Sequence, residues 1–176
     1  MSNTETIKIL YHTDKIEKLT YIDGKSDWID LRAAEDVVIE GPHSLTLNKT
    51  TNRRKVVFSG YKIPLGIGMK LPKGVEAHIL PRSGTYEDYP IIMRNSEGII
   101  DHSYSGPNDQ WRFAAVAMGD TRIEKGKRIC QFRLQLSQKA TIWQKIKWLF
   151  TNKIKFEFVD DYDGVDRGGF GSTGRN

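Results

Sequence analysis

The sequence predicts an all-β protein, a sandwich or barrel of short strands. Apolar residues alternate with polar or small ones through the middle of the chain, and a period of two belongs to strands rather than helices. Glycine, proline, asparagine and aspartate separate these stretches at the spacing typical of sandwiches and barrels. With 176 residues, 38% apolar and 28% charged, the chain is expected to form one folded domain over 1–176.

The longest alternating stretch lies between residues 61 and 80. Its first apolar run ends at residue 71 and its second begins at residue 75, and the intervening 72–74 (Pro-Lys-Gly) has the composition of a tight turn. We therefore expect the two runs to form a hairpin. The apolar residues on one parity are Ile63, Leu65, Ile67, Met69 and Leu71, followed by Val75, Ala77 and Ile79.

Three further strands are predicted at 91–93, 113–118 and 128–136. In the last one Cys130 shares a face with Phe132, so we expect this cysteine to be a small core residue. A single cysteine excludes an internal disulfide and every zinc cluster built on several thiolates. The four histidines are scattered and show no zinc-binding spacing, so no zinc site is expected.

The segment 137–150 departs from this period and predicts one short basic amphipathic helix. Ser137 is the expected N-cap, and lysines interrupt an apolar stripe. We expect the stripe to pack on the domain or on a neighbouring subunit; the alternative is a membrane surface. The stripe consists of Ile142, Trp143, Ile146, Leu149 and Phe150.

The net charge of +5 suits a partner rich in phosphate without identifying one. Much of the excess lies in 49–55 and 139–155, and neither run is dense enough to predict a nucleic-acid tail. No nucleic-acid partner is expected, although the loop 49–59 or the helix could contact a protein. The sequence has no membrane-spanning stretch and no signal-peptide pattern, which predicts a cytoplasmic protein.

Three glycine-punctuated segments carry groups suited to phosphate chemistry: LPRSGT at 80–85, NSEGIIDHSYSG at 95–106 and RGGFGSTG at 167–174. In the first, the guanidinium of Arg82, the hydroxyl of Ser83 and the backbone at Gly84 can approach an anion. In the second, a short strand leads to Asp101, which either orients a water molecule or caps a turn. The third belongs to a glycine-rich stretch, 164–176, that predicts a mobile C-terminal arm.

These segments, together with WIDLRAA at 28–34 and GKRICQF at 126–132, resemble in order and spacing the five motifs of the trimeric dUTPase family. The residues of several motifs are most similar to those of the phage and prophage branch. The resemblance implies a jelly-roll fold, a homotrimer with sites at subunit boundaries, and Mg²⁺-dependent hydrolysis of dUTP to dUMP and pyrophosphate. In phage, the host cytoplasm would be its compartment.

The resemblance also implies a role for each matching residue. Asp101 would be the base that orients the attacking water, and Tyr104 the ring that excludes a ribose 2′-hydroxyl. Asn95 would pair with uracil, helped by the backbone of Gly98 and Ile100. The remaining assignments are phosphate contacts from Arg82, Ser83, Gly84 and Gln131, Mg²⁺ held through water by Asp30, uracil stacking by Phe170 of a neighbouring arm, and triphosphate contacts from Arg167, Gly171, Ser172 and Thr173.

The sequence also departs from the family pattern. Ser105 follows Tyr104 where the family usually has an arginine, with Arg112 as a substitute, and Arg167 is closer to Phe170 than usual. The segments 137–150 and 49–59 look like additions. Two rival functions remain, a dCTP deaminase-like enzyme and a phage protein whose main role is partner binding. The first needs a second carboxylate, and the strand RFAAVAM has none.

Overall fold

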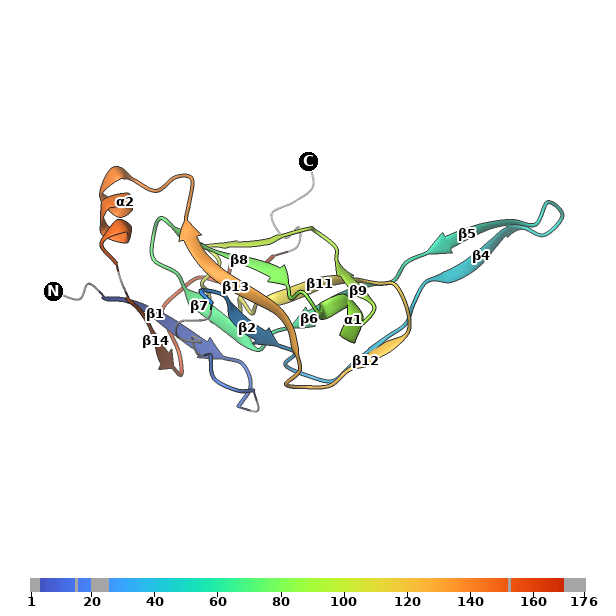
Figure 1. Cartoon of the computed structure of the whole chain (residues 1–176), viewed down its shortest axis with the longest axis horizontal. Helices are drawn as coiled ribbons and strands as arrows, with labels where there is room; N and C mark the ends of the chain where they lie inside the picture. Colours follow the sequence, from blue (N-terminus) through green and yellow to red (C-terminus); the bar gives the residue numbers. More distant parts are fainter. Residues whose placement is uncertain (1–3, 15, 20–25, 152, 170–176) are drawn as a thin grey trace.

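The structure, a computed structural model, describes residues 4–14, 16–19, 26–151 and 153–169. This part of the chain is mostly β, as the sequence predicts, with fourteen strands and two short helices (Figure 1). The helices are α1 (Thr85–Asp88) and α2 (Ile142–Leu149). The strands are β1 (Thr4–Tyr11), β2 (Ile29–Arg32), β3 (Val37–Ile39), β4 (His43–Asn48), β5 (Arg53–Val57), β6 (Gly60–Pro64), β7 (Ile67–Lys70), β8 (Val75–Pro81), β9 (Ile91–Met93), β10 (Gly98–Asp101), β11 (Arg112–Ala117), β12 (Thr121–Ile123), β13 (Arg128–Leu136) and β14 (Lys153–Val159).

Three sheets surround the core. Their strand orders are β14-β1-β7, β10-β8-β13-β2 and β6-β11-β9, and two further pairs, β12-β3 and β4-β5, lie beside them. The two ends of the described chain meet in the first sheet, where β1 and β14 run parallel, a pairing that the sequence did not suggest. Large apolar side chains that are fully buried fill the space between the sheets, among them Ile7, Met69, Trp111, Phe113 and Phe132.

The segment 61–80 is β structure as predicted, but its first run is divided into β6 and β7, which lie in different sheets, and the predicted hairpin is wrong. β7 pairs with β1, whereas β8 pairs with β10 and β13, so the two runs belong to different sheets. The turn itself forms, with Gly74 in the left-handed region and a hydrogen bond from the Val75 N–H to the Pro72 carbonyl. The chain changes sheet at this turn instead of folding back on the strand that precedes it.

The strand predicted at 128–136 has the predicted bounds and lies in the middle of its sheet as β13. Cys130 is fully buried in the core, as predicted, and burial raises the pKa of its thiol well above the ordinary value. This cysteine therefore serves as a packing residue.

The predicted helix is shorter than 137–150 and its expected N-cap is wrong. Thr141 caps α2 through a capping box with Gln144, while the Ser137 N–H bonds the Gly74 carbonyl. The apolar stripe is not packed on its own domain, because Trp143 is 76% exposed and Leu149 is 78% exposed. The face that lies against the body instead carries Gln144, Lys147, Trp148 and Thr151. No helix in the described segments is long and apolar enough to cross a membrane.

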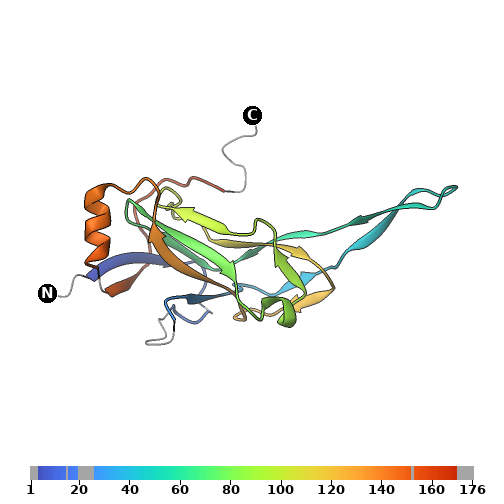
Figure 2. The ribbon, with the colours of Figure 1, turned by 45° about the horizontal axis from the view of Figure 1, so that its top comes forward.

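The segment expected as a loop at 49–59 instead contains the turn and the second strand of a two-stranded ribbon. Among the described strands, β4 and β5 pair only with each other, and the ribbon projects from the body at the end opposite α2 (Figures 1 and 2). Every residue from 43 to 56 is exposed. The sequence did not predict this ribbon because neither face of the ribbon is buried, so its strands lack the alternation of apolar and polar residues that marks a half-buried strand.

Candidate active site

A pocket of ≈ 320 Å³ lies beside β10, where the third glycine-punctuated motif meets the C-terminal segment. Asn95, Gly98, Ile100, Asp101 and Tyr104 line it, so the structure brings together the residues assigned to uracil, deoxyribose and water. Its volume is within the range of small-molecule sites. Arg112, the expected substitute for the missing arginine, also lines it, as do Arg167, Gly168 and Gly169 from the C-terminal segment.

Asp101 is placed at the end of β10 by a tight turn. The Tyr104 N–H bonds the Asp101 carbonyl at 3.1 Å, and this turn does not lead into a hairpin, because β10 pairs with β8 and not with the next strand. Ser103 donates to Asp101 Oδ1 twice, from its hydroxyl at 2.6 Å and from its N–H at 2.8 Å. Sequence reasoning missed Ser103, although a serine two residues after an aspartate is a common turn partner.

Arg167 pairs with the same carboxylate. Its Nη1 lies 3.1 Å from Asp101 Oδ1 and 3.0 Å from Oδ2. Partial burial by itself raises the pKa of Asp101, but the two bonds from Ser103 and the charge of Arg167 outweigh it and hold the pKa below its ordinary value. Asp101 is therefore ionised at neutral pH, as a proton acceptor must be.

Tyr104 forms one wall of the pocket. Its hydroxyl donates to the Gln110 carbonyl at 3.0 Å, which fixes the ring, and burial raises the pKa of this hydroxyl above its ordinary value. The C-terminal segment touches the ring, because a Cβ on Gly169 would lie 3.4 Å from Tyr104 Cε2. The ring therefore stands between β10 and the start of the arm.

A buried carboxylate fastens this C-terminal segment to the pocket. Asp109 is 2% exposed, and its Oδ2 accepts the N–H groups of Gly106 and Arg167, both at 2.9 Å. Its Oδ1 accepts the Gly168 N–H at 3.0 Å. Outside this contact, Asp166 accepts both the N–H and the amide Nδ2 of Asn108. We call Asn108, Asp109 and the segment they bind, 166–168, the arm clasp.

The residues assigned to phosphate and Mg²⁺ form a second cluster. Asp30 on β2 accepts from Arg82 Nε at 2.8 Å through Oδ1 and from Arg128 Nη1 at 3.0 Å through Oδ2. Gln131 lies directly opposite Asp30 across the β13–β2 pair. Ser83 is exposed, and Gly84 is the N-cap of α1. Arg128 was not among the predicted site residues.

The two clusters lie at opposite ends of β8. Glu76, near the start of β8, is the register partner of Asp101, and Arg82 follows the strand six positions later. At ~3.3 Å per residue this corresponds to about 20 Å. One chain thus does not bring Asp101 and Arg82 together. Phe170, Gly171, Ser172 and Thr173 lie outside the described residues.

Comparison with known proteins agrees with the motif order. A family model described as dUTPase matches residues 29–174. The chain belongs to the dUTPase family. It is 42% identical over 168 residues to the SPbeta prophage-derived deoxyuridine 5′-triphosphate nucleotidohydrolase YosS of Bacillus subtilis, covering 96% of this chain and 97% of that protein. It is also 33% identical to a deoxyuridine 5′-triphosphate nucleotidohydrolase of Rickettsia prowazekii, over 81% of this chain and 82% of the relative.

Solved dUTPase structures share the fold. The dUTPase from Streptococcus mutans aligns with a TM-score of 0.59 at 16% identity, covering 76% of this chain and 98% of that one. A mutant dUTPase from phage phi11 of S. aureus, whose structure is described as coordinating a structural Mg(II) ion, aligns with a TM-score of 0.60 at 13% identity, covering 78% and 95%. The jelly-roll architecture implied by the motifs is thereby confirmed.

Within this dUTPase, the pocket also separates the family from its deaminase rival. Asp101 is the one carboxylate among the described residues that line the pocket, and Ala114, on the strand that would carry a second acid, presents no ionisable group. The described lining therefore offers one carboxylate, where deamination by paired carboxylates would use two.

Proposed function

We propose that this chain hydrolyses dUTP to dUMP and pyrophosphate, with Asp101 as the group that orients and deprotonates the attacking water. The observation that carries the proposal is an ionised carboxylate at the edge of a pocket lined by an amide and an aromatic ring. The 42% identity to a prophage deoxyuridine triphosphate nucleotidohydrolase supports the substrate.

In this pocket Asn95 has the donor and acceptor needed to pair with uracil, and the backbone of Gly98 and Ile100 supplies further polar groups. Tyr104 would pack against the deoxyribose. Because its hydroxyl is held by Gln110, the ring cannot turn away to admit a 2′-hydroxyl. We propose that Phe170 of a neighbouring arm stacks on uracil and that Gly171, Ser172 and Thr173 contact the phosphates.

Asp101 would act through its Oδ2 atom. Ser103 occupies Oδ1 with two donated hydrogen bonds, so Oδ2 faces a single partner, the guanidinium of Arg167. When Arg167 turns to the substrate phosphates, this oxygen becomes able to accept a proton from water. In-line attack on the α-phosphorus then releases pyrophosphate.

The second cluster would bind the triphosphate. Arg82, Arg128 and the polar groups of Ser83, Gly84 and Gln131 have the charge and the donors that phosphate oxygens need. Because about 20 Å separates this cluster from Asp101 in one chain, a complete site needs the second cluster of a neighbouring copy. This separation supports the homotrimer with shared sites.

The donor set is compatible with Mg²⁺ bound mainly to the substrate. Mg²⁺ keeps several waters and is typically held by one or two carboxylates together with phosphates. Asp30 offers one carboxylate, and both of its oxygens already accept from arginines, so it would reach the ion through water. Bound there, Mg²⁺ would neutralise charge on the phosphate oxygens.

The test is pyrophosphate release from dUTP, dCTP, dTTP and UTP by the purified protein. We expect dUTP to be hydrolysed with a kcat/KM at least ~100-fold above the others, because the amide pairing and the fixed ring each exclude a competitor. Ammonia release from dCTP would support the deaminase instead, and no turnover of any of the four nucleotides would support a pure binding role.

A further inference from the structure

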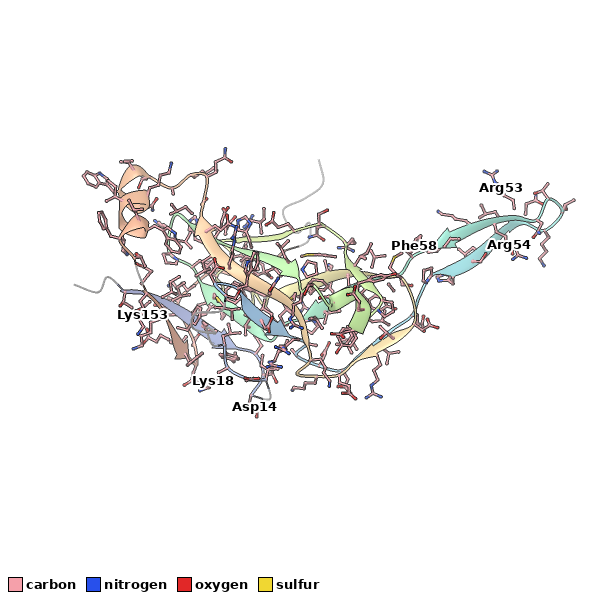
Figure 3. The ribbon with its side chains drawn as sticks, viewed as in Figure 1. Asp14, Lys18, Arg53, Arg54, Phe58 and Lys153 are labelled. Atoms are coloured by element: carbon pink, nitrogen blue, oxygen red, sulfur yellow. The ribbon has the colours of Figure 1, made fainter. Side chains whose placement is uncertain are left out.

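We propose that the ribbon formed by β4 and β5 is a binding arm for double-stranded DNA. The ribbon extends away from the body, with Arg53 and Arg54 on its outer part and Phe58 at its base, just after β5 ends (Figures 1 and 3). Each of its strands spans about 15–20 Å, from five or six residues at ~3.4 Å. Nothing in the proposed hydrolysis uses this part of the chain.

The charge of the ribbon is one-sided. Lys49, Arg53, Arg54 and Lys55 give it four cations, and the sequence has no aspartate or glutamate between Glu40 and Glu76. All four cations are exposed, and none forms an ion pair with another described residue. The ribbon thus carries four cations and no carboxylate, which suits a polyanion.

The register argues for phosphate rather than for an ordinary protein interface. Leu45 lies opposite Lys55 on one face, and Thr46 lies opposite Arg54 on the other, so each face carries a cation. The exposed apolar side chains are divided as well: Leu45 and Val56 fall on different faces, and Leu47 lies at the register irregularity between Thr46 and Asn48. No face offers the charge-depleted apolar centre of a protein interface, whereas a ribbon with cations on both sides can contact the two phosphate backbones that border a DNA groove.

The shape of the ribbon suits the major groove of double-stranded DNA. A two-stranded ribbon fits the major groove of B-DNA, and several DNA-binding proteins insert such ribbons. An isolated two-stranded hairpin is only marginally stable in water, and no third strand from the described part of the chain pairs with this one. From the sequence alone, the basic run 49–55 did not predict a nucleic-acid partner. The structure places this run on a projecting two-stranded ribbon, which holds its cations in a defined arrangement.

The experiment measures binding of the full chain to a fluorescein-labelled 20-base-pair DNA duplex by fluorescence anisotropy between 50 and 200 mM salt. Four phosphate contacts give a slope of about −3.6 in log K against log salt, or about a 150-fold loss of affinity over this range. The variant Arg53→Gln/Arg54→Gln/Lys55→Gln leaves one contact, so its affinity should fall only about three- to fourfold over the same range and should be at least ~10-fold lower at 50 mM.

The matched control is Lys139→Gln/Lys145→Gln/Lys153→Gln, which removes three exposed cations in or near α2 in the sequence. Helix α2 lies at the end of the molecule opposite the ribbon (Figure 1). We expect it to bind DNA within about twofold of the unchanged chain. Equal loss in both variants would overturn the proposal, since binding would then follow net charge alone. All variants are checked for dUTP hydrolysis and melting temperature, neither of which should change.

Three other results would also overturn the proposal. Tighter binding of an RNA duplex or of single-stranded DNA would show that the ribbon does not recognise a B-form groove. Binding of a poly-glutamate peptide as tight as that of DNA would identify an acidic protein as the partner. A lower oligomeric state of the ribbon variant on multi-angle light scattering would show that the ribbon is a contact between copies of this chain.

Discussion

The substitution Asp109→Asn tests whether the arm clasp controls access to the catalytic carboxylate. Asp109 uses both oxygens to hold three backbone N–H groups, two of which belong to Arg167 and Gly168. An asparagine has the same shape but only one acceptor oxygen. Whichever way its amide turns, at least one of the three N–H groups then faces an NH₂ group instead of an oxygen.

The magnitude follows from these contacts. A hydrogen bond to a charged acceptor contributes about 1.5–3 kcal/mol. With the less costly orientation, in which only the Gly168 bond is lost, the ratio of docked to undocked arm should fall by about ten- to 150-fold, at 1.4 kcal/mol for each factor of ten. Since Arg167 lies in the clasp, its contact with Asp101 should weaken in parallel.

Limited trypsin digestion measures this opening without relying on activity. Trypsin cleaves after Arg167, and cleavage of a transiently opened segment follows the population of the open form. We expect the rate of this cut, followed by mass spectrometry, to rise at least ~10-fold in Asp109→Asn, and kcat/KM for dUTP to fall. Asp120→Asn is the matched control, because it removes the same charge from an Asp that accepts the Gly41 N–H outside the pocket. A folded Asp109→Asn protein whose cut after Arg167 is within twofold of the unchanged chain would refute the clasp.

The remaining predictions concern the base, the arm and the helix. Asp101→Asn should lower kcat by ~10²-fold or more and leave nucleotide affinity within a few-fold; a kcat near that of the unchanged chain would exclude Asp101 as the base. Ser103→Ala removes one of the bonds that lower the pKa of Asp101. It should therefore raise this pKa in an NMR titration, and with it the acid limb of kcat/KM. The stability that Asp101 contributes is present above its unfolded pKa of about 3.8 and is lost as pH falls through the lower folded value, so Ser103→Ala should lose it at higher pH. Truncation before Arg167 should abolish most activity with little change in melting temperature, and a large fall in melting temperature would make the arm structural. Trp143→Asp/Ile146→Asp should lower trimer content on light scattering, because a neighbouring subunit would cover this exposed stripe; an unchanged trimer would exclude that contact.

The sequence predicted a strand correctly where the residues of that strand and its flanking turns are sufficient to specify it. β13 has its predicted bounds because its alternating side chains and flanking turns specify it locally. Pairing was not predictable in the same way. The Pro72 to Val75 turn has the same composition whether it closes a hairpin or joins two sheets, and what separates β7 from β8 is the affinity of β7 for β1, a segment far away in the sequence.

The helix shows a second limit of sequence patterns. Its apolar stripe correctly predicted a helix, but the face that lies against the body is the one with Gln144 and Trp148. Periodicity identifies the apolar face of a helix, but it does not show whether that face packs against the same chain or against another one. Thr141 replaced Ser137 as the N-cap because only Thr141 is followed three positions later by a glutamine that can complete a capping box.

In the candidate site, too, residues within one motif were predicted, whereas a residue that depends on a distant segment was not. The motifs identified Asp101, Asn95 and Tyr104, which lie within one short stretch of sequence and line one pocket. They did not identify Asp109, because its function depends on Arg167 and Gly168, more than fifty positions later. A turn aspartate that binds its own loop and one that also binds the C-terminal segment have the same local sequence.

The pairing of Arg167 with Asp101 adds a step to the proposed reaction. Before substrate binds, the guanidinium lies 3.0 Å from Asp101 Oδ2 and helps to hold the pKa of that carboxyl below its ordinary value, which makes it a weak base. Triphosphate offers Arg167 a more highly charged partner. If the guanidinium moves to the phosphates, Asp101 loses a cation at the moment when its oxygen is needed by water, and its pKa rises. The residue that helps to bind the phosphates would thus also strengthen the base, and it would do so only when substrate is present.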